Sequence, residues 1–230
     1  MPENVTGGRG LKSKILEALK KKDFEKGLQE ISRLSARQAV NPLFSFFYHS
    51  DDLIKWRAIT AMGALVTELA EIDMESARVI VRRLLWNLND ESGGIGWGSP
   101  EALGEIMARH PKLAAEYSDI LISYIRKGQN YIEYEPLQRG VLWGLGRLAQ
   151  ERPHRLKEVP ALLLPYLESK DAALRGLAAW TAGLLRSDLT IKLLQKLDHD
   201  NQVIKLFLDG RLMEKTVGHL AQEALSRIGC

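Results

Sequence analysis

The chain has 230 residues, which fits one compact domain or one short array of repeats and is long enough to bury a sizeable core. Apolar residues make up 45% and charged residues 27%, a balance that excludes a wholly disordered chain. A net charge of +3 is too small to indicate nucleic acid or an anionic membrane by itself, and the single cysteine, Cys230, excludes a disulfide framework and a cysteine-rich zinc site.

The first ten residues contain glycines and no apolar core, so we expect a flexible tail over 1–10 and no secretory signal there. The most apolar stretches, 43–48 and 161–167, are far shorter than the roughly 18 residues that a membrane helix needs. We therefore expect a protein without a membrane partner, in a reducing compartment, the cytoplasm.

Apolar residues recur at helical spacing along the chain, while the alternating patterns typical of strands are almost absent. Residues 11–39 predict a basic helical pair that caps a larger structure. Beyond them, short apolar helices are predicted at 43–48, 79–88, 120–125, 162–167 and 191–197. Each is followed by a polar or acidic turn and a second helix, which begins near residue 56, 100, 139, 175 or 217. We therefore expect an all-α protein whose residues 40–230 form about five helical pairs.

Three of the predicted second helices open with an arginine: Arg57, Arg139 and Arg175. Arg139 follows Arg57 by 82 residues, and Arg175 follows Arg139 by 36. The first spacing is two units of about 41 residues, the period of HEAT-type helical pairs. Over 40–230 the pattern resembles HEAT-repeat proteins, and the resemblance implies a right-handed α-solenoid. Because the arginines recur from unit to unit, we favour pairing with turn aspartates of neighbouring units over a ladder that binds anions.

A glycine-rich segment, 90–105, interrupts the repeat. It holds four glycines within six positions: Gly93, Gly94, Gly96 and Gly98. Ser99 and Pro100 then predict the start of a helix. The segment is either a loop for a ligand or partner at one edge of the array, or a structural loop whose Trp97 fills a gap between repeats. It resembles the DESGGIGWGxPE signature of a bacterial HEAT-repeat family found largely in sulfate-reducing and related bacteria, which implies the fold and leaves the function open.

Tryptophans occur about once per unit, in or just before the second helix, at positions 56, 97, 143 and 180. The second helices of a HEAT array line its concave face, where aromatic side chains make binding hot spots, although core packing is the alternative. Trp86, in a first helix, is expected in the core. Tyr134, in an acidic and aromatic segment, could form a rim beside Trp97 that suits a basic or polar partner, and an ordinary inter-helix loop is the alternative.

The segment 201–215 departs from the pattern, because it is long and apolar and contains a possible turn at 207–210. We expect it either to cover the last helical pair, whose end would otherwise expose apolar surface, or to make a dimer contact.

These features predict a non-enzymatic protein-interaction scaffold that uses the concave face and the 93–105 loop. The predicted binding surface consists of Trp56, Arg57, Gly94, Trp97, Glu101, Tyr134, Arg139, Trp143, Arg175 and Trp180. No cofactor and no metal are predicted, because the five histidines show no paired ligand spacing and no catalytic triad is recognisable. A protein partner is expected, with nucleic acid as the less favoured one.

The alternative is an enzyme on the same scaffold. In length and in the spacing of Trp97, Glu101, Arg139 and Trp180, the chain is loosely similar to the HEAT-like alkylpurine DNA glycosylases. The resemblance implies that the two tryptophans stack on an altered nucleotide, that Arg139 holds a phosphate, and that Glu101 stabilises positive charge on the sugar. That family has Asp where this chain has Glu101. A role with a tetrapyrrole-type cofactor, as in the HEAT-like phycobilin lyases, rests on the repeat class alone.

Overall fold

The computed structural model of the protein describes residues 8–89 and 96–230. The N-terminal helices are α1 (Gly8–Lys20) and α2 (Phe24–Ser32). The helices that follow are α3 (Ala36–Phe46), α4 (Asp52–Ile72), α5 (Met74–Leu88), α6 (Ser99–Arg109), α7 (Pro111–Ser123), α8 (Glu135–Glu151), α9 (Val159–Leu167), α10 (Ala172–Leu185), α11 (Ile191–Lys196) and α12 (Val217–Ile228). Two short 3₁₀ helices, η1 (Pro153–Arg155) and η2 (Asp188–Thr190), and two strands, β1 (Val203–Leu208) and β2 (Arg211–Thr216), complete the described part.

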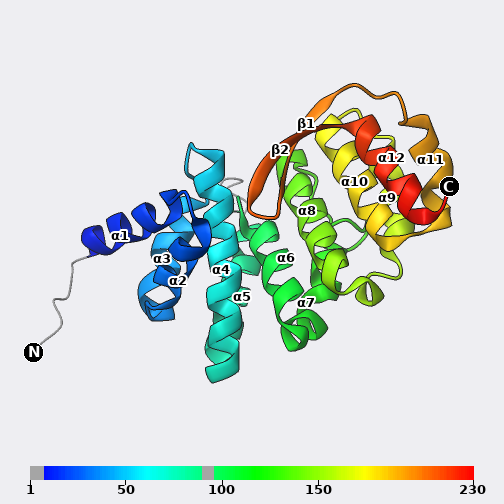
Figure 1. Cartoon of the computed structure of the whole chain (residues 1–230). Helices are drawn as coiled ribbons and strands as arrows, with labels where there is room; N and C mark the ends of the chain where they lie inside the picture. Colours follow the sequence, from blue (N-terminus) through cyan, green and yellow to red (C-terminus); the bar gives the residue numbers. More distant parts are fainter. Residues whose placement is uncertain (1–7, 90–95) are drawn as a thin grey trace, which may run out of the picture.

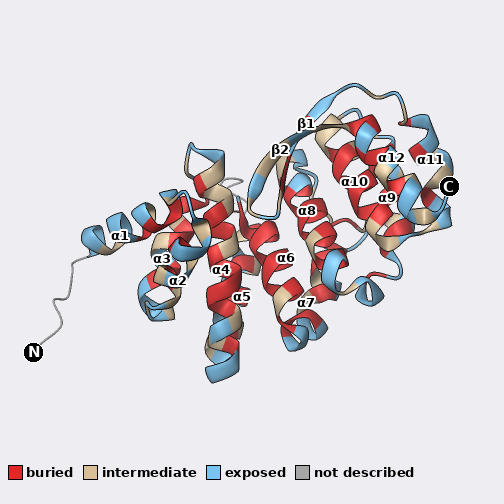
Figure 2. Ribbon diagram, in the orientation of Figure 1, coloured by how far each residue is buried: buried red, intermediate tan, exposed pale blue. Residues whose placement is uncertain are grey.

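The helices form an all-α solenoid, as predicted, with pairs α3–α4, α5–α6, α7–α8, α9–α10 and α11–α12 (Figure 1). The second helices of the pairs (α4, α6, α8, α10 and α12) contact one another in succession, and we call them the inner layer. Most of the buried residues lie on these helices and on the sides of the first helices that face them (Figure 2). The helix α1 begins at Gly8, so the predicted tail over 1–10 is wrong at its last three residues.

Small residues set the spacing of the inner layer. A Cβ atom added at Gly104 of α6 would lie 2.3 Å from the Cα atom of Gly144 in α8, so the two backbones touch. In the same way, a Cβ atom at Gly146 would lie 2.1 Å from the ring of Trp180, which is 3% exposed. Trp180 therefore packs in the core between α8 and α10, and its prediction as part of a binding surface is wrong.

Arg57 of α4 links the N-terminal pair, α1 and α2, to the rest of the array through hydrogen bonds. Its guanidinium donates to the backbone carbonyls of Leu19, at 2.7 Å, and Lys21, at 2.8 Å, and lies 4.9 Å from the Phe24 ring. These bonds satisfy carbonyl groups that the end of α1 leaves free. Arg57 is thus a buried structural residue and not part of an exposed surface.

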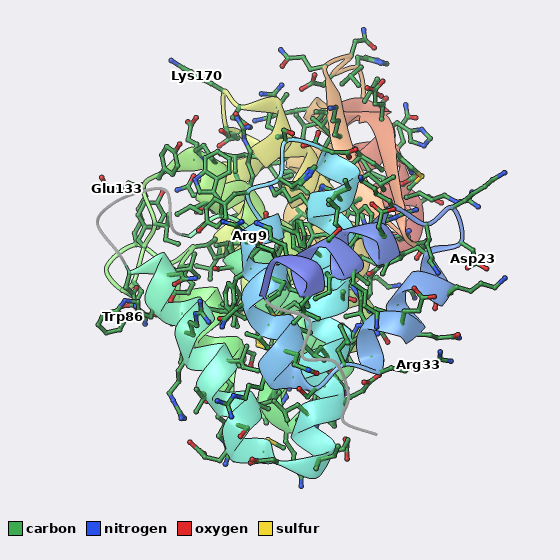
Figure 3. All side chains as sticks on the ribbon, turned by 90° about the vertical axis from the view of Figure 1, so that its left-hand side faces the viewer. Arg9, Asp23, Arg33, Trp86, Glu133 and Lys170 are labelled. Carbon is green, nitrogen blue, oxygen red and sulfur yellow. The ribbon has the colours of Figure 1, made fainter. Side chains whose placement is uncertain are left out.

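Arg175 is also structural. Its guanidinium donates to Oδ2 of Asp200, at 2.8 and 2.6 Å, and to the carbonyl of Ser169 at 2.7 Å. It joins the first turn of α10 to the turn before β1, and it is not among the residues that line the cleft described below. The sequence predicts Trp86 in the core, but it lies on α5 with 74% of its surface exposed (Figure 3).

The segment 201–215 contains a β-hairpin, which the helical interpretation of the sequence missed. The strands β1 and β2 are antiparallel, and Val203 faces Thr216 at the open end. The connecting residues, Asp209 and Gly210, both have positive φ, 49° and 75°, as a two-residue hairpin turn requires. The hairpin leaves the last helical pair and runs along the inner layer (Figure 1). It therefore does not simply cover the end of the array, as one interpretation of the sequence expected.

Near its tip the hairpin is attached to the first helical pair. The Phe207 ring stacks on Trp56 of α4, with 5.1 Å between centroids and 4° between planes. The indole N–H of Trp143 in α8 donates to the Phe207 carbonyl at 2.9 Å. An exposed ion pair, 3.0 Å long, joins Lys205 to Asp52, which lie 153 positions apart in the sequence. Because exposed ion pairs contribute at most about 1 kcal/mol, we assign most of this attachment to the aromatic contacts.

None of the helices in the described ranges 8–89 and 96–230 is long and apolar enough to cross a membrane.

Candidate binding site

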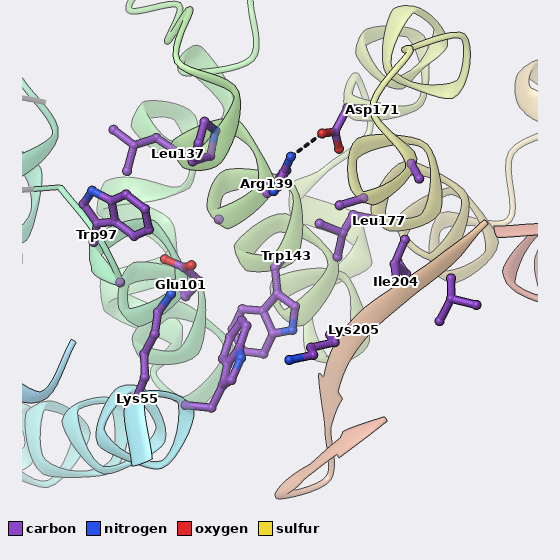
Figure 4. Close-up of a pocket in the computed structure, with 17 residues that line it drawn as sticks. Lys55, Trp97, Glu101, Leu137, Arg139, Trp143, Asp171, Leu177, Ile204 and Lys205 are labelled. Atoms are coloured by element: carbon purple, nitrogen blue, oxygen red, sulfur yellow. Dashed lines mark hydrogen bonds and ion pairs between the residues drawn. The ribbon is translucent and has the colours of Figure 1, made fainter. Parts of the chain in front are cut away.

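A cleft of about 430 Å³ opens on the inner layer beside the hairpin (Figure 4). The first turns of α6, α8 and α10 border it, together with α4 and the strand β1. The polar and aromatic side chains that line it are Lys55, Trp56, Trp97, Glu101, Arg139, Trp143, Asp171 and Lys205. The cleft thus collects residues from four helical pairs and the hairpin.

Glu101 forms the floor of the cleft. It lies in the first turn of α6 and is 7% exposed. Its Oε2 atom has no hydrogen-bond partner within the described part of the chain. The carboxyl packs against α8 at Gly140, where an added Cβ atom would lie 2.8 Å from Oε2. A buried carboxyl oxygen without a donor is costly, so this position favours a ligand that brings one.

Burial raises the pKa of the Glu101 carboxyl, and the positive charge of Lys55 acts against that increase. In the unfolded chain the carboxyl has its ordinary pKa, so the folded protein holds the proton to a higher pH than the unfolded chain does. The contribution of Glu101 to stability is therefore largest below the ordinary pKa and decreases as the pH rises through the raised pKa of the folded state.

We expect the Glu101→Gln variant to lack this decrease. The measurement is the free energy of unfolding, from urea titrations between pH 4 and pH 8, for the wild type and the variant. The free energy of unfolding of the variant, minus that of the wild type, should increase as the pH rises. A constant difference over that interval would contradict a raised pKa for Glu101.

Trp97 and Lys55 form one wall of the cleft. Trp97 is 38% exposed, and the Lys55 ammonium lies 5.6 Å from the centroid of its ring. No carboxylate among the described residues lies within ion-pair distance of Lys55. Figure 4 shows the end of the Lys55 side chain directed toward Glu101. Trp97 therefore presents an aromatic face to the cleft, and the chain's own cation lies over it.

The opposite rim is an ion pair between Arg139 and Asp171 (Figure 4). Asp171 also caps α10, because its carboxylate accepts from the backbone N–H of Leu174 at 2.8 Å. Burial acts to raise the pKa of Asp171, but the hydrogen bonds from Arg139 and Leu174 hold it below its ordinary value. Arg139 is thus paired with the aspartate of the following turn, as the structural interpretation of the sequence expected.

The structure brings together only part of the predicted surface. Trp56 and Trp143 line the cleft, but the hairpin covers them through Phe207. Tyr134 is 47% exposed at the start of α8 and does not line the cleft. Gly94 lies outside the described residues.

The four residues that resemble the glycosylase pattern do not form one site. Trp97, Glu101 and Arg139 line the cleft, but Trp180 is buried between α8 and α10. The pair of facing tryptophans that the resemblance implies is therefore not formed.

Sequence reasoning did not single out Lys55 and Lys205 as site residues. Lys55 precedes Trp56 and Arg57, which was a signal that the residues around the start of the second helix face the inner layer. Lys205 carried no such signal, because its position depends on the hairpin.

A second cleft, of about 300 Å³, lies at the hairpin tip and contains another buried carboxyl, Glu105. This carboxylate is satisfied, because it accepts from Arg109 and Arg147, each at 2.7 Å. The contrast with Glu101 marks the first cleft as the one with unused hydrogen-bonding capacity. Among the described residues, no group of three or more His, Cys, Asp and Glu side chains could hold a metal ion.

Residues 135–181, which span α8 to α10, match the HEAT-like repeat family. Over 175 residues the chain is 26% identical to an uncharacterized protein of Archaeoglobus fulgidus, and the match covers 76% of this chain and 88% of that protein. The matched repeat lies within the all-α solenoid, and it supports a relation to HEAT-like repeats for this part of the chain.

Known structures with the same fold include two engineered proteins. One has a TM-score of 0.55 and 16% identity, with 95% of this chain and 96% of that chain covered. The other is a designed armadillo repeat protein in complex with the peptide (KR)4, with a TM-score of 0.53 and 15% identity, covering 95% of this chain and 99% of that chain. At this level of identity the likeness shows the fold alone.

Proposed function

We propose that the protein is a protein-interaction scaffold whose inner-layer cleft receives a basic side chain from a partner polypeptide. The observation that carries the proposal is Glu101 at the floor of a cleft with an aromatic wall, because one oxygen of its buried carboxyl, Oε2, has no hydrogen-bond donor among the described residues. Ammonium and guanidinium groups supply both hydrogen-bond donors and the positive charge that the face of a tryptophan attracts.

The position of Lys55 supports a cationic ligand. Its ammonium already lies over Trp97, and no ion pair with the described residues holds it there. A partner's cation would displace this flexible side chain into solvent and take its place beside Glu101. The designed armadillo protein of the same fold holds a peptide of alternating basic residues, which is consistent with this choice of partner.

The test is a calorimetric titration of the protein with an eight-residue peptide of alternating Lys and Arg, which measures the affinity for the peptide. Glu101→Gln keeps the shape of the side chain and removes its charge, so it should weaken binding about tenfold or more, as the loss of a hydrogen bond to a charged group predicts. The matched control is Glu135→Gln, an exposed carboxylate in the first turn of α8, which should change the affinity by less than about threefold.

Lys55→Met tests whether the cleft prefers a cationic or an anionic ligand, because it removes the ammonium and keeps the length of the side chain. We expect this variant to bind the basic peptide more tightly than the wild type does. Weaker binding of the basic peptide by Lys55→Met, together with binding of a Glu-Asp peptide by the wild type, would instead identify the cleft as a site for anions and overturn the proposal.

A further inference from the structure

One edge of the strand β1 pairs with β2, and residues 203–205 of this strand line the cleft. The two-residue turn makes the residues that flank it a hydrogen-bonded pair, and such pairs alternate with non-bonded pairs along an antiparallel ladder. The backbone N–H and C=O groups of Val203, Lys205 and Phe207 therefore point away from β2. The bond from the Trp143 indole to the Phe207 carbonyl supports this assignment, since a carbonyl directed at β2 could not reach it.

Two of these outward positions lie at the cleft. Val203 and Lys205 both line it, and Val203 is 58% exposed. Within the described residues the sheet has two strands, so no third strand covers this edge of β1. A free edge with outward N–H and C=O groups is a template for pairing with another extended chain.

We propose that the partner segment binds in extended form, as a third strand on the free edge of β1. This inference rests on the proposed function, because it specifies how the basic polypeptide is held. Side chains alternate along a strand, so a segment paired with Val203 and Lys205 directs every second side chain to the same side, toward Trp97 and Glu101. Backbone hydrogen bonds then give affinity, and the carboxyl at the floor selects the basic side chain.

The size of the cleft favours this mode over a bound helix. An α-helix with its side chains is about 10 Å across, so a single turn would already fill about 430 Å³. Neighbouring strands lie only about 4.8 Å apart, so an extended segment beside β1 needs much less room than a helix does.

The test compares Val203→Pro with Val203→Ala in the titration with the Lys-Arg peptide. Both variants lose the valine side chain, but only proline removes the outward N–H, and proline is tolerated at the first residue of a strand. We expect Val203→Pro to weaken binding about fivefold or more, which is the effect of one lost backbone hydrogen bond, and Val203→Ala to change it less than about twofold.

A second measurement uses the wild-type protein and does not depend on how the proline variant folds. Peptides that are N-methylated at every second residue, in one of two alternating sets, remove one row of amide donors at a time. We expect one set to lose binding and the other to keep it. Hydrogen exchange at the Lys205 amide should also slow when the unmodified peptide binds.

The outcomes separate this inference from the proposed function. Binding that depends on Glu101 but is equally strong for Val203→Pro and for both methylated sets would overturn strand addition and leave the basic-ligand cleft intact. Absence of any Glu101-dependent binding would overturn both.

Discussion

Gly104→Ala should destabilise the protein by about 2 kcal/mol, although alanine is the better helix former. The added methyl group would lie 2.3 Å from the Cα atom of Gly144, where only movement of a helix backbone can relieve the contact. Overpacking of this kind lowers the free energy of unfolding by about 3 kcal/mol at the upper end of its usual range. The better helix propensity of alanine offsets about 1 kcal/mol of this loss. The measurement is a urea titration, in which the midpoint should fall while the slope stays unchanged.

Gly8→Ala is the matched control for that experiment. Gly8 also lies in a helix, but a Cβ atom added there has nothing within 4 Å. The same substitution should therefore be neutral or slightly stabilising. If Gly104→Ala were as stable as this control, the contact between α6 and α8 would be looser than described.

Phe207→Ala should release the hairpin and leave the helical array folded. The variant loses the stack on Trp56, and Phe→Ala changes in a packed site cost about 3–5 kcal/mol. Because the remaining tip contact includes an exposed ion pair, we expect the loss to appear as local opening and not as global unfolding. Amide hydrogen exchange in β1 and β2 should become faster, and tryptophan emission should shift to the red as Trp56 and Trp143 become hydrated.

Leu212→Ala provides the comparison, because Leu212 lies directly opposite Phe207 in the register but is only half-buried. The hairpin of the Leu212→Ala variant should stay attached, and its amide hydrogen exchange should change less than in Phe207→Ala. Equal behaviour of the two variants would mean that general strand packing, and not the Phe207 stack, holds the hairpin.

The helical array could be predicted from the sequence because its periodicity is a local property. The predicted helix over 79–88, for example, corresponds to α5, Met74–Leu88, and the predicted start near 100 corresponds to α6, Ser99–Arg109. The hairpin could not be predicted in the same way. Its strand β1, VIKLFL, has buried residues on both faces, so the alternation that indicates a strand is obscured. The Asp-Gly turn was visible, but its partners on α4 are about 150 positions away.

The candidate site was only partly predictable for a related reason. The spacing of Trp97 and Glu101 placed them on one turn of a helix start, and they do line one cleft. A periodic pattern, however, does not separate the side of an inner helix that faces the cleft from the side that faces its neighbour. Trp180 therefore followed the same pattern as Trp143, yet it fills the space that Gly146 leaves between α8 and α10.

The hairpin also changes how the array responds to shortening. In a repeat array each unit contacts only its neighbours, so the loss of a terminal unit is felt mainly by the next one. Here the hairpin between α11 and α12 places Phe207 on Trp56 of α4, in the first helical pair. Truncation after residue 200 would therefore uncover the Trp56 ring on α4, so the loss of the C-terminal unit would also destabilise the first helical pair.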